Sequence, residues 1–276
     1  MTNHSSLGTV YLVGAGPGAA DLITVRGAKL LAKADIVLHD ALVDPEMLAL
    51  CPHAIKVAVG KRCGKLSSAQ AFINKRLVDA AHQYQTIVRL KGGDPMLFGR
   101  ADEELSALKD AGISFEIVPG ITAALAGAAS LQKSLTLRGV ARSVAFVTLA
   151  QASEDVKSTL QPISNPSADT LVYYMGRKDA AKIAQQLLET SSNHRGNTPV
   201  HILEAVSTPK ERHWESTLEA LAAGKANDWF DSSSPALILI GQALETNSEG
   251  SLECTSTKVD DRLQDSQILS DSRRRA

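Results

Sequence analysis

The chain has 276 residues, of which 44% are hydrophobic, and its formal net charge at pH 7 is −1. A charge this close to zero gives no electrostatic reason to bind nucleic acid or an anionic membrane, and no apolar run is long enough to cross a bilayer. We therefore expect a globular protein of the cytoplasm, without a signal peptide, whose partner is a small molecule.

The first half of the chain alternates short apolar strands with helices. Strands are predicted at residues 9–13, 36–39, 55–59, 86–90 and 115–118. The helix after the first strand is expected to begin at Asp21 as its N-cap, and a helix over 101–111 is expected to end at Gly112. This alternation predicts an α/β fold with a mainly parallel sheet.

The segment after the 86–90 strand is the first candidate site. Gly92 and Gly93 leave the main chain bare, so a ligand can approach its N–H and C=O groups closely. Asp94 adds an acceptor for an amine or a hydroxyl group. Because ligands of open α/β sheets bind outside the carboxyl ends of the strands, the sequence predicts a small-molecule site at this loop.

A second glycine turn, Gly14-x-Gly16-x-x-Ala19, follows the first strand. It matches the dinucleotide-binding pattern, and Asp40 stands where a ribose-binding acid is expected. Pro17 lies within the turn, however, and has no N–H to offer to a phosphate group. We favour a tight turn, and a ligand shared between several strand ends, over a pyrophosphate site.

The strand and helix alternation resumes after residues 119–122. Strands are predicted at 143–149, 170–175, 200–204 and 236–240, and helices at 177–190 and 216–223. Beyond about residue 245 the chain is rich in Ser, Thr and Asp, which indicates a disordered tail. The predicted organisation is two α/β lobes, residues 1–120 and 121–245, with a tail at 246–276.

Charged residues also follow the predicted strands. Asp40 and Lys61 each follow a strand, so a base and a cation could share one rim of the sheet. Arg100, Arg138 and Arg142 are candidates for binding carboxylates, because guanidinium groups bind them bidentately, and Arg100 is favoured. The histidines show no paired spacing and the three cysteines no CxxC spacing, so no metal site is predicted.

Seven blocks stand in order over about residues 9–242. They are Val10-Tyr-Leu-Val-Gly-Ala-Gly-Pro-Gly18, Val59-Gly-Lys-Arg62, residues 88–100, Val118-Pro-Gly-Ile-Thr122, Arg138-Gly-Val-Ala-Arg-Ser143, Tyr174-Met-Gly176 and Ser234-Pro-Ala236. Together they resemble the tetrapyrrole methylase family, and in particular its members that methylate uroporphyrinogen III. The resemblance implies the tetrapyrrole methylase fold, two α/β lobes with the active site in the cleft between them, and a homodimer.

The resemblance also implies the site residues. Asp40 would be the proton acceptor and Lys61 the proton donor, while Arg100 and Arg138 would pair with the carboxylates of the substrate. The chain departs from the family pattern at Leu66, where many relatives have histidine, and at Ala205-Val206, which replaces a common Asn-Gly. The implied contacts of the cofactor S-adenosyl-L-methionine are Pro17, Gly92, Gly93, Asp94, Leu97, Thr122, Ala123, Met175 and Val206.

The implied reaction is C-methylation. Two methyl groups would pass from S-adenosyl-L-methionine to C2 and C7 of uroporphyrinogen III, giving S-adenosyl-L-homocysteine and precorrin-2 for sirohaem, cobalamin or haem d1 synthesis. The dehydrogenase–ferrochelatase module of fused sirohaem synthases is not seen before these blocks, so methylation alone is expected.

Three alternatives remain open. A methylase of a later corrin intermediate would share the family pattern. A nicotinamide-dependent oxidoreductase would use the Gly14 turn and Asp40, and a non-catalytic binding module would make use of the tail.

Overall fold

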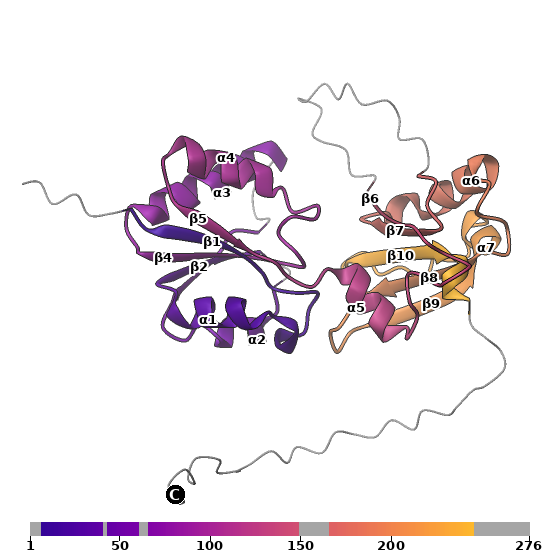
Figure 1. Ribbon diagram of the computed structural model, residues 1–276, viewed down its shortest axis with the longest axis horizontal. Coiled ribbons are helices and arrows are strands. Elements are labelled where there is room, and N and C mark those ends of the chain that lie inside the picture. Colours follow the sequence, from indigo (N-terminus) through magenta and orange to yellow (C-terminus); the bar gives the residue numbers. More distant parts are fainter. Residues whose placement is uncertain (1–6, 41–42, 61–65, 149–165, 246–276) are drawn as a thin grey trace, which may run out of the picture. The chain divides into compact units, whose positions relative to one another are not determined.

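The structure, a computed structural model, describes residues 7–40, 43–60, 66–148 and 166–245, without the side chains of residues 66–69. It contains two sheets of five strands each (Figure 1). In the described part of the chain, no helix is long and apolar enough to cross a membrane.

The first sheet has the order β3-β2-β4-β1-β5. All four strand pairings are parallel, as the sequence predicts. The strands are β1 (Thr9–Gly14), β2 (Ile36–His39), β3 (Ile55–Ala58), β4 (Thr86–Lys91) and β5 (Phe115–Val118).

Helices cover both faces of the first sheet (Figure 1). Successive strand residues point to opposite faces, so Ile87 packs in the cluster beneath α3 and α4, whereas Val88 and Leu90 pack in the cluster beneath α1 and α2. The helices are α1 (Val25–Lys33), α2 (Pro45–Ala49), α3 (Leu66–Ala81) and α4 (Ala101–Asp110), with the 3₁₀ turn η1 (Ala20–Leu22) before α1.

Two predicted helix boundaries can be compared with the structure. Asp21 is not the N-cap of α1, because it lies in the 3₁₀ turn, and Thr24 caps the helix by accepting a hydrogen bond from the Gly27 N–H at 3.2 Å. Gly112 is confirmed at the end of α4, where its φ of +66° suits the left-handed C′ position.

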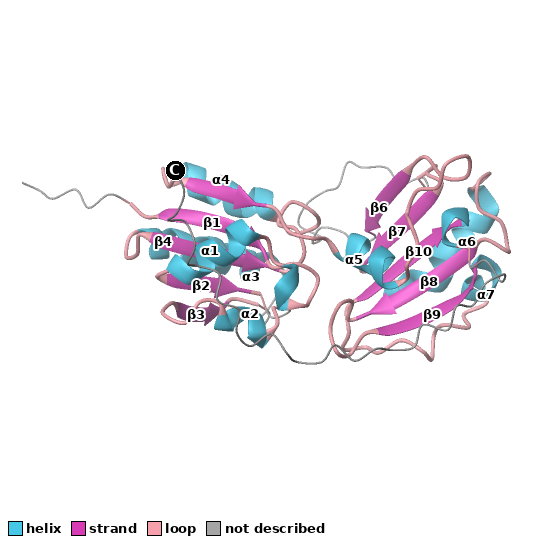
Figure 2. Ribbon diagram, turned by 60° about the horizontal axis from the view of Figure 1, so that its bottom comes forward, coloured by secondary structure: helices cyan, strands magenta, loops and turns pink. Residues whose placement is uncertain are grey.

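The second sheet is mixed, with the order β6-β7-β10-β8-β9 (Figure 2). The β6–β7 pairing is parallel and the other three are antiparallel. Helices α6 and α7 pack on one face and α5 on the other. The strands are β6 (Val144–Thr148), β7 (Thr170–Tyr174), β8 (Pro199–Glu204), β9 (Arg212–Thr217) and β10 (Ala236–Gly241). The helices are α5 (Ala123–Ser130), α6 (Ala180–Thr190) and α7 (Leu218–Ala222), with the 3₁₀ turns η2 (Arg177–Asp179) and η3 (Gln242–Leu244).

The predicted helix over 216–223 is wrong at its start, because residues 212–217 form the strand β9 and α7 begins only at Leu218. This edge strand has no buried residue and therefore lacks an apolar pattern. The predicted division at residue 120 falls in the connection between β5 and α5, and remains a prediction. The predicted tail at 246–276 lies outside the described residues.

Candidate functional site

Four glycines bring the carboxyl ends of β1, β4 and β5 into close backbone contact. Gly93 N–H donates to the Gly16 carbonyl oxygen at 2.6 Å, and Gly16 N–H donates to the Gly93 carbonyl oxygen at 3.2 Å. A Cβ on Gly14 would lie 2.5 Å from the Gly120 Cα, and one on Gly120 would lie 2.3 Å from the Gly93 oxygen. The two glycine loops predicted to share a ligand are therefore joined directly to each other.

This arrangement uses backbone N–H groups that a dinucleotide phosphate would need. The N–H of Gly16 is already used by Gly93, and the N–H of Ala15 donates to the Lys91 carbonyl oxygen. Moreover, only the short 3₁₀ turn η1 follows the glycine turn and α1 begins at Val25, so no α-helix N-terminus lies at the glycine turn to hold a pyrophosphate. The structure thus favours the tight turn over the nucleotide-binding alternative.

Asp94 fixes the loop that follows β4. Its Oδ1 accepts from the Met96 N–H at 2.8 Å, and its Oδ2 accepts from the Gly120 N–H at 2.9 Å. Since a carboxylate oxygen can accept more than one hydrogen bond, a ligand contact would add to these bonds. Beside it, no atom of the described residues lies within 4 Å of the position that a Cβ on Gly93 would take. The loop therefore offers a rigid main chain with room beside it.

The nine predicted cofactor positions all lie where the chain leaves a strand. They are Pro17 after β1; Gly92, Gly93, Asp94 and Leu97 after β4; Thr122 and Ala123 after β5; Met175 after β7; and Val206 after β8.

Tyr174, at the end of β7, links several of these loops. Its hydroxyl group lies 2.6 Å from Thr122 Oγ1 and accepts from the Ala124 N–H at 3.1 Å. Its ring contacts Phe98 of the β4 loop, with centroids 5.2 Å apart. Burial raises the pKa of Tyr174, although the hydrogen bond to Thr122 opposes this shift, so its hydroxyl group acts as a neutral structural link. The sequence assigned Tyr174 no role.

The loops after β1 and β8 also meet. Ala19 N–H donates to Ser207 Oγ at 3.2 Å, and a Cβ on Gly18 would lie 2.8 Å from the Val206 carbonyl oxygen. The Val206 side chain is buried in the core, so a ligand would meet its backbone. Pro17 and Val206, 189 positions apart in the sequence, therefore belong to neighbouring loops.

Backbone strain is concentrated in the same loops. Six non-glycine residues of the described chain have a positive φ, and all but Gln132 lie within one residue of a predicted site residue. Such conformations cost about 1–3 kcal/mol each and cluster at ligand-binding and active sites. The five others are Phe98, Arg100, Met175, Ala205 and Ser207.

Asp40, the predicted proton acceptor, is held by a buried ionic network. Arg89 Nη2 donates to Asp40 Oδ1 at 2.6 Å, and Arg89 Nε donates to Glu104 Oε1 at 3.1 Å. Lys91 Nζ donates to the same Glu104 oxygen at 3.0 Å. The side chains of Arg89 and Glu104 are 2% and 0% exposed, whereas that of Asp40 is 31% exposed. The network therefore reaches from the protein interior to a carboxylate that a ligand can approach.

The charges of this network balance in number. Two cations, Arg89 and Lys91, meet two carboxylates, those of Asp40 and Glu104. Burial, with a smaller contribution from Arg89, lowers the pKa of Lys91. Glu104 Oε2 is buried and finds no hydrogen-bond partner among the described residues. The other predicted catalytic residue, Lys61, lies outside the described residues.

Of the two arginines predicted to bind carboxylates, Arg100 already pairs with an acidic side chain and Arg138 is exposed on a turn. Arg100 follows the glycine loop but pairs bidentately with Glu103, through Nε–Oε1 at 2.6 Å and Nη2–Oε2 at 2.8 Å. A substrate carboxylate would have to displace or share this partner. Arg138 is exposed on the turn closed by the Leu137–Ala141 bridge. Their roles as substrate contacts remain predictions.

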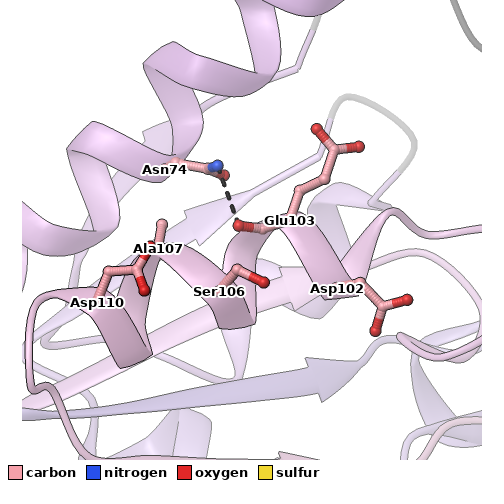
Figure 3. A pocket seen from close by; sticks show the side chains of 6 residues that line it. All are labelled: Asn74, Asp102, Glu103, Ser106, Ala107 and Asp110. Atoms are coloured by element: carbon pink, nitrogen blue, oxygen red, sulfur yellow. Dashed lines mark hydrogen bonds between the residues drawn. The ribbon is translucent and has the colours of Figure 1, made fainter. Parts of the chain in front are cut away.

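A surface hollow of about 430 Å³ lies elsewhere, between α3 and α4 (Figure 3). Asn74 donates to the Glu103 carbonyl oxygen at 3.1 Å across it. Three carboxylate side chains, Asp102, Glu103 and Asp110, line this hollow. These charges would repel a ligand rich in carboxylates, so we do not assign the tetrapyrrole site to it.

Comparison with known proteins points to one family. The family model described as Tetrapyrrole (Corrin/Porphyrin) Methylases matches residues 9–222. The "Uroporphyrinogen-III C-methyltransferase" of Pseudomonas aeruginosa is 41% identical over 235 residues, which are 85% of this chain and 94% of that protein. The "Siroheme synthase" of Psychrobacter sp. is 39% identical over 251 residues, 90% of this chain but 50% of that protein. The chain therefore spans about half the length of the curated siroheme synthases it matches.

Solved structures give the same result. Uroporphyrin-III C-methyl transferase from Thermus thermophilus, complexed with S-adenyl homocysteine, matches with a TM-score of 0.72 and 38% identity over 86% of this chain and 93% of that one. The cobalt precorrin-4 methyltransferase CbiF matches with a TM-score of 0.71 and 27% identity over 86% of this chain and 96% of that one. The predicted fold class is thereby confirmed.

Proposed function

Because the chain belongs to the tetrapyrrole methylase family, we propose that it transfers methyl groups from S-adenosyl-L-methionine to uroporphyrinogen III. Two successive transfers, to C2 and C7, would give precorrin-2. The observation that carries this proposal is that the chain segments at the carboxyl ends of β1, β4, β5, β7 and β8 contact one another. The segments after β1 and β4, for example, are hydrogen-bonded to each other through Gly16 and Gly93.

The residues present fit the cofactor. S-adenosyl-L-methionine supplies an activated, electrophilic methyl group when it is bound. The open side of Gly93 and the bare main chain of Gly92 would hold it, and the exposed Met175, fixed at a φ of 57°, would border it. Asp94 keeps this loop rigid through its two backbone hydrogen bonds. Holding two reactants in the correct orientation can lower a bimolecular barrier by roughly 7–11 kcal/mol, so rigidity is the main contribution of this loop.

Proton removal is assigned to Asp40. Methylation of a pyrrole carbon leaves the ring system cationic, so a proton must leave, and a carboxylate near the reacting ring can accept it. The guanidinium group of Arg89 holds Oδ1 of Asp40, so the carboxylate keeps one orientation. Arg89 and Glu104 act here as positioning residues.

The test is anaerobic incubation of the protein with uroporphyrinogen III and S-adenosyl-L-methionine, with the product mass as the readout. A doubly methylated product is expected from the wild type, and a much lower kcat from Asp40→Asn. Asp44→Asn is the matched control, because either side chain can cap α2 at this position. A tetrapyrrole of unchanged mass would refute the activity, whereas full activity of Asp40→Asn would refute only the assigned base.

A methylase of a later corrin intermediate is the second candidate, and the likeness to CbiF supports it. Parallel assays with uroporphyrinogen III and a cobalt precorrin would separate the two, because the true substrate would give the higher kcat/KM.

We further propose that the protein is a cytoplasmic homodimer. The exposed apolar side chains Leu125, Leu137, Val140 and Phe146 support an interface between copies. Light scattering coupled to size exclusion would show the mass of a dimer, and a monomer at micromolar concentration would contradict the proposal.

A further inference from the structure

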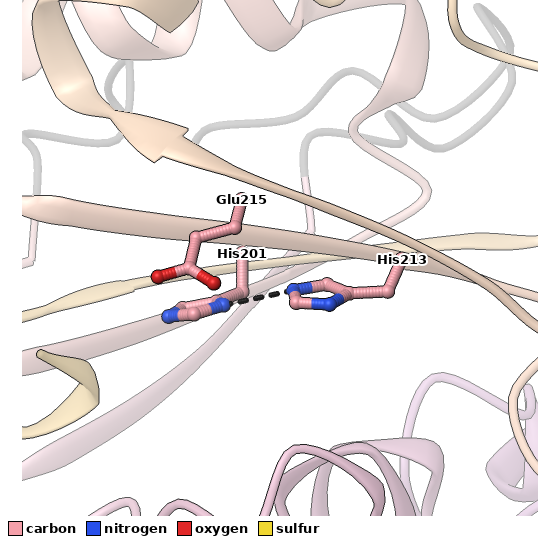
Figure 4. Close-up of side chains that lie close together, drawn as sticks. All are labelled: His201, His213 and Glu215. Atoms are coloured by element: carbon pink, nitrogen blue, oxygen red, sulfur yellow. Dashed lines mark hydrogen bonds between the residues drawn. The ribbon is translucent and has the colours of Figure 1, made fainter. Parts of the chain in front are cut away.

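The hairpin of β8 and β9 carries a cluster of three possible metal ligands outside the site described above (Figure 4). His213 and Glu215 are two residues apart on β9, so their side chains share one face of the sheet. His201 stands directly opposite Glu215 on β8. The spacing of histidines along the chain gave no sign of this cluster, because it depends on a strand that the sequence did not reveal.

One ring of the cluster is already oriented as metal-bound histidines are. His201 is 1% exposed, and its Nε2 lies 2.9 Å from the Leu244 carbonyl oxygen. A carbonyl oxygen can only accept, so Nε2 carries a proton, and in the neutral ring Nδ1 presents the lone pair. Histidine ligands generally donate their second ring N–H to a carbonyl or carboxylate, which fixes the tautomer.

The lone pair of His201 points at the second histidine. His201 Nδ1 and His213 Nε2 are 2.9 Å apart, and the planes of the two rings differ by only 16°.

We propose that His201, His213 and Glu215 bind a zinc ion. One donor atom from each residue lies within 4.8 Å of the others. Two histidines and one glutamate form a known zinc ligand set that leaves the fourth tetrahedral position to water. This proposal does not depend on the methyltransferase activity.

The two histidine nitrogens need only a small change of separation, whereas the Glu215 carboxylate, which lies within 4.8 Å of them, would turn toward the ion. Two Zn–N bonds of about 2.0–2.1 Å at a tetrahedral angle require the nitrogens to be roughly 3.3 Å apart, a few tenths of an ångström more than in this structure. His213 is exposed on an edge strand and can move by this amount. Its proton would shift from Nε2 to Nδ1, so the exchange of a hydrogen bond for a metal bond leaves both rings neutral. Zinc would thus join β8 to β9 and, through His201, to the Leu244 carbonyl oxygen.

The experiment uses the full chain without an affinity tag, treated with chelator and titrated with zinc chloride by calorimetry. One zinc ion per chain is expected to bind, and zinc should raise the Tm of the wild type. His213→Gln and Glu215→Gln should each weaken binding roughly tenfold or more and abolish the rise in Tm. Both residues are exposed, so neither substitution threatens the fold.

His82→Gln is the matched control, because His82 is an exposed histidine in the turn after α3, away from the β8–β9 hairpin. It should bind zinc as the wild type does. Equal binding by His213→Gln and His82→Gln would place the ion elsewhere in the chain. If the wild type binds no zinc, His201 and His213 are joined only by their hydrogen bond. Either result overturns the proposal.

Discussion

The buried network behind Asp40 makes the most direct prediction, tested by Arg89→Met. This substitution keeps the apolar stem but removes a cation whose side chain is 2% exposed and which contacts two carboxylates. Removing one partner of a buried ion pair costs about 3–5 kcal/mol, because a charge is left without compensation in the interior. For a chain of this size each kcal/mol lowers the Tm by roughly 2–4 °C, so a loss of roughly 6–20 °C is expected.

The matched control is Arg26→Met. Arg26 also pairs with a glutamate, Glu116, at 3.0 Å, but the two side chains are 67% and 48% exposed. Exposed pairs contribute about 0–1 kcal/mol, so this variant should unfold close to the wild-type temperature. Urea denaturation monitored by circular dichroism measures both variants under the same conditions. If they differ by less than about 1 kcal/mol, the charges at Arg89 are not buried in solution and the reasoning fails.

A kinetic cycle separates positioning from simple loss of stability. Below its Tm, Arg89→Met should lower kcat while its affinity for S-adenosyl-L-homocysteine stays unchanged, because Arg89 acts through Asp40. In the Asp40→Asn background the same substitution should cause little further loss of kcat, since the group it positions is gone. Additive losses in the double variant would show that Arg89 does not act through Asp40.

Three further predictions concern the packing of the site and its surroundings. Gly14→Ala should be strongly destabilising in thermal unfolding, because its Cβ would meet the backbone of Gly120, whereas Gly196→Ala, whose Cβ meets nothing closer than 3.4 Å, should be nearly neutral. Tyr174→Phe should weaken S-adenosyl-L-homocysteine binding measured by calorimetry and lower stability by about 1 kcal/mol, because two hydrogen bonds of its hydroxyl group are lost; unchanged binding would contradict its linking role. Burial lowers the pKa of His194 in the folded state below its ordinary value of 6.5, so the stability that the neutral ring contributes is present above pH 6.5 and is lost as the pH falls toward the folded-state pKa. His194→Asn should therefore flatten the dependence of the unfolding free energy on pH in this range. An unchanged pH dependence would refute the assignment to His194.

Much of the first sheet could be predicted from the sequence, because each of its buried strands is a short apolar run next to a turn signal. The glycine contacts were also foreseen in kind, since bare main chain after two strands indicates close approach. Strand β9 was not foreseen, because an edge strand without a buried residue has no clear apolar period to detect. The cluster at His201 and His213 was missed for the same reason, since it exists only once β8 and β9 pair.

The roles of Arg89 and Glu104 could not be predicted for a different reason. Arg89 lies inside an apolar strand, where a single charge gives no hint of its partners. Its contact with Asp40 depends on β2 and β4 being neighbours, although β3 stands between them in the chain. Its contact with Glu104 depends on alternate residues of β4 facing α4. Strand order and facing are properties of the whole sheet, and local patterns in one sequence do not contain them.

The strand order also explains why one strand end serves two purposes. The chain passes from β1 to β2 through α1, and from β4 to β5 through α4. These two helices lie on opposite faces of the sheet, so the neighbouring strands β1 and β4 send the chain to opposite faces. At such a switch point the loops diverge and leave room for a ligand. Arg89 and Lys91, at the end of β4, point toward α4. Gly92 and Gly93 follow directly and leave the main chain without side chains. The ionic network lies directly behind the bare loop, so β4 would fix both the proposed base and the proposed cofactor position. We therefore expect substitutions at Arg89 to reduce turnover without preventing cofactor binding.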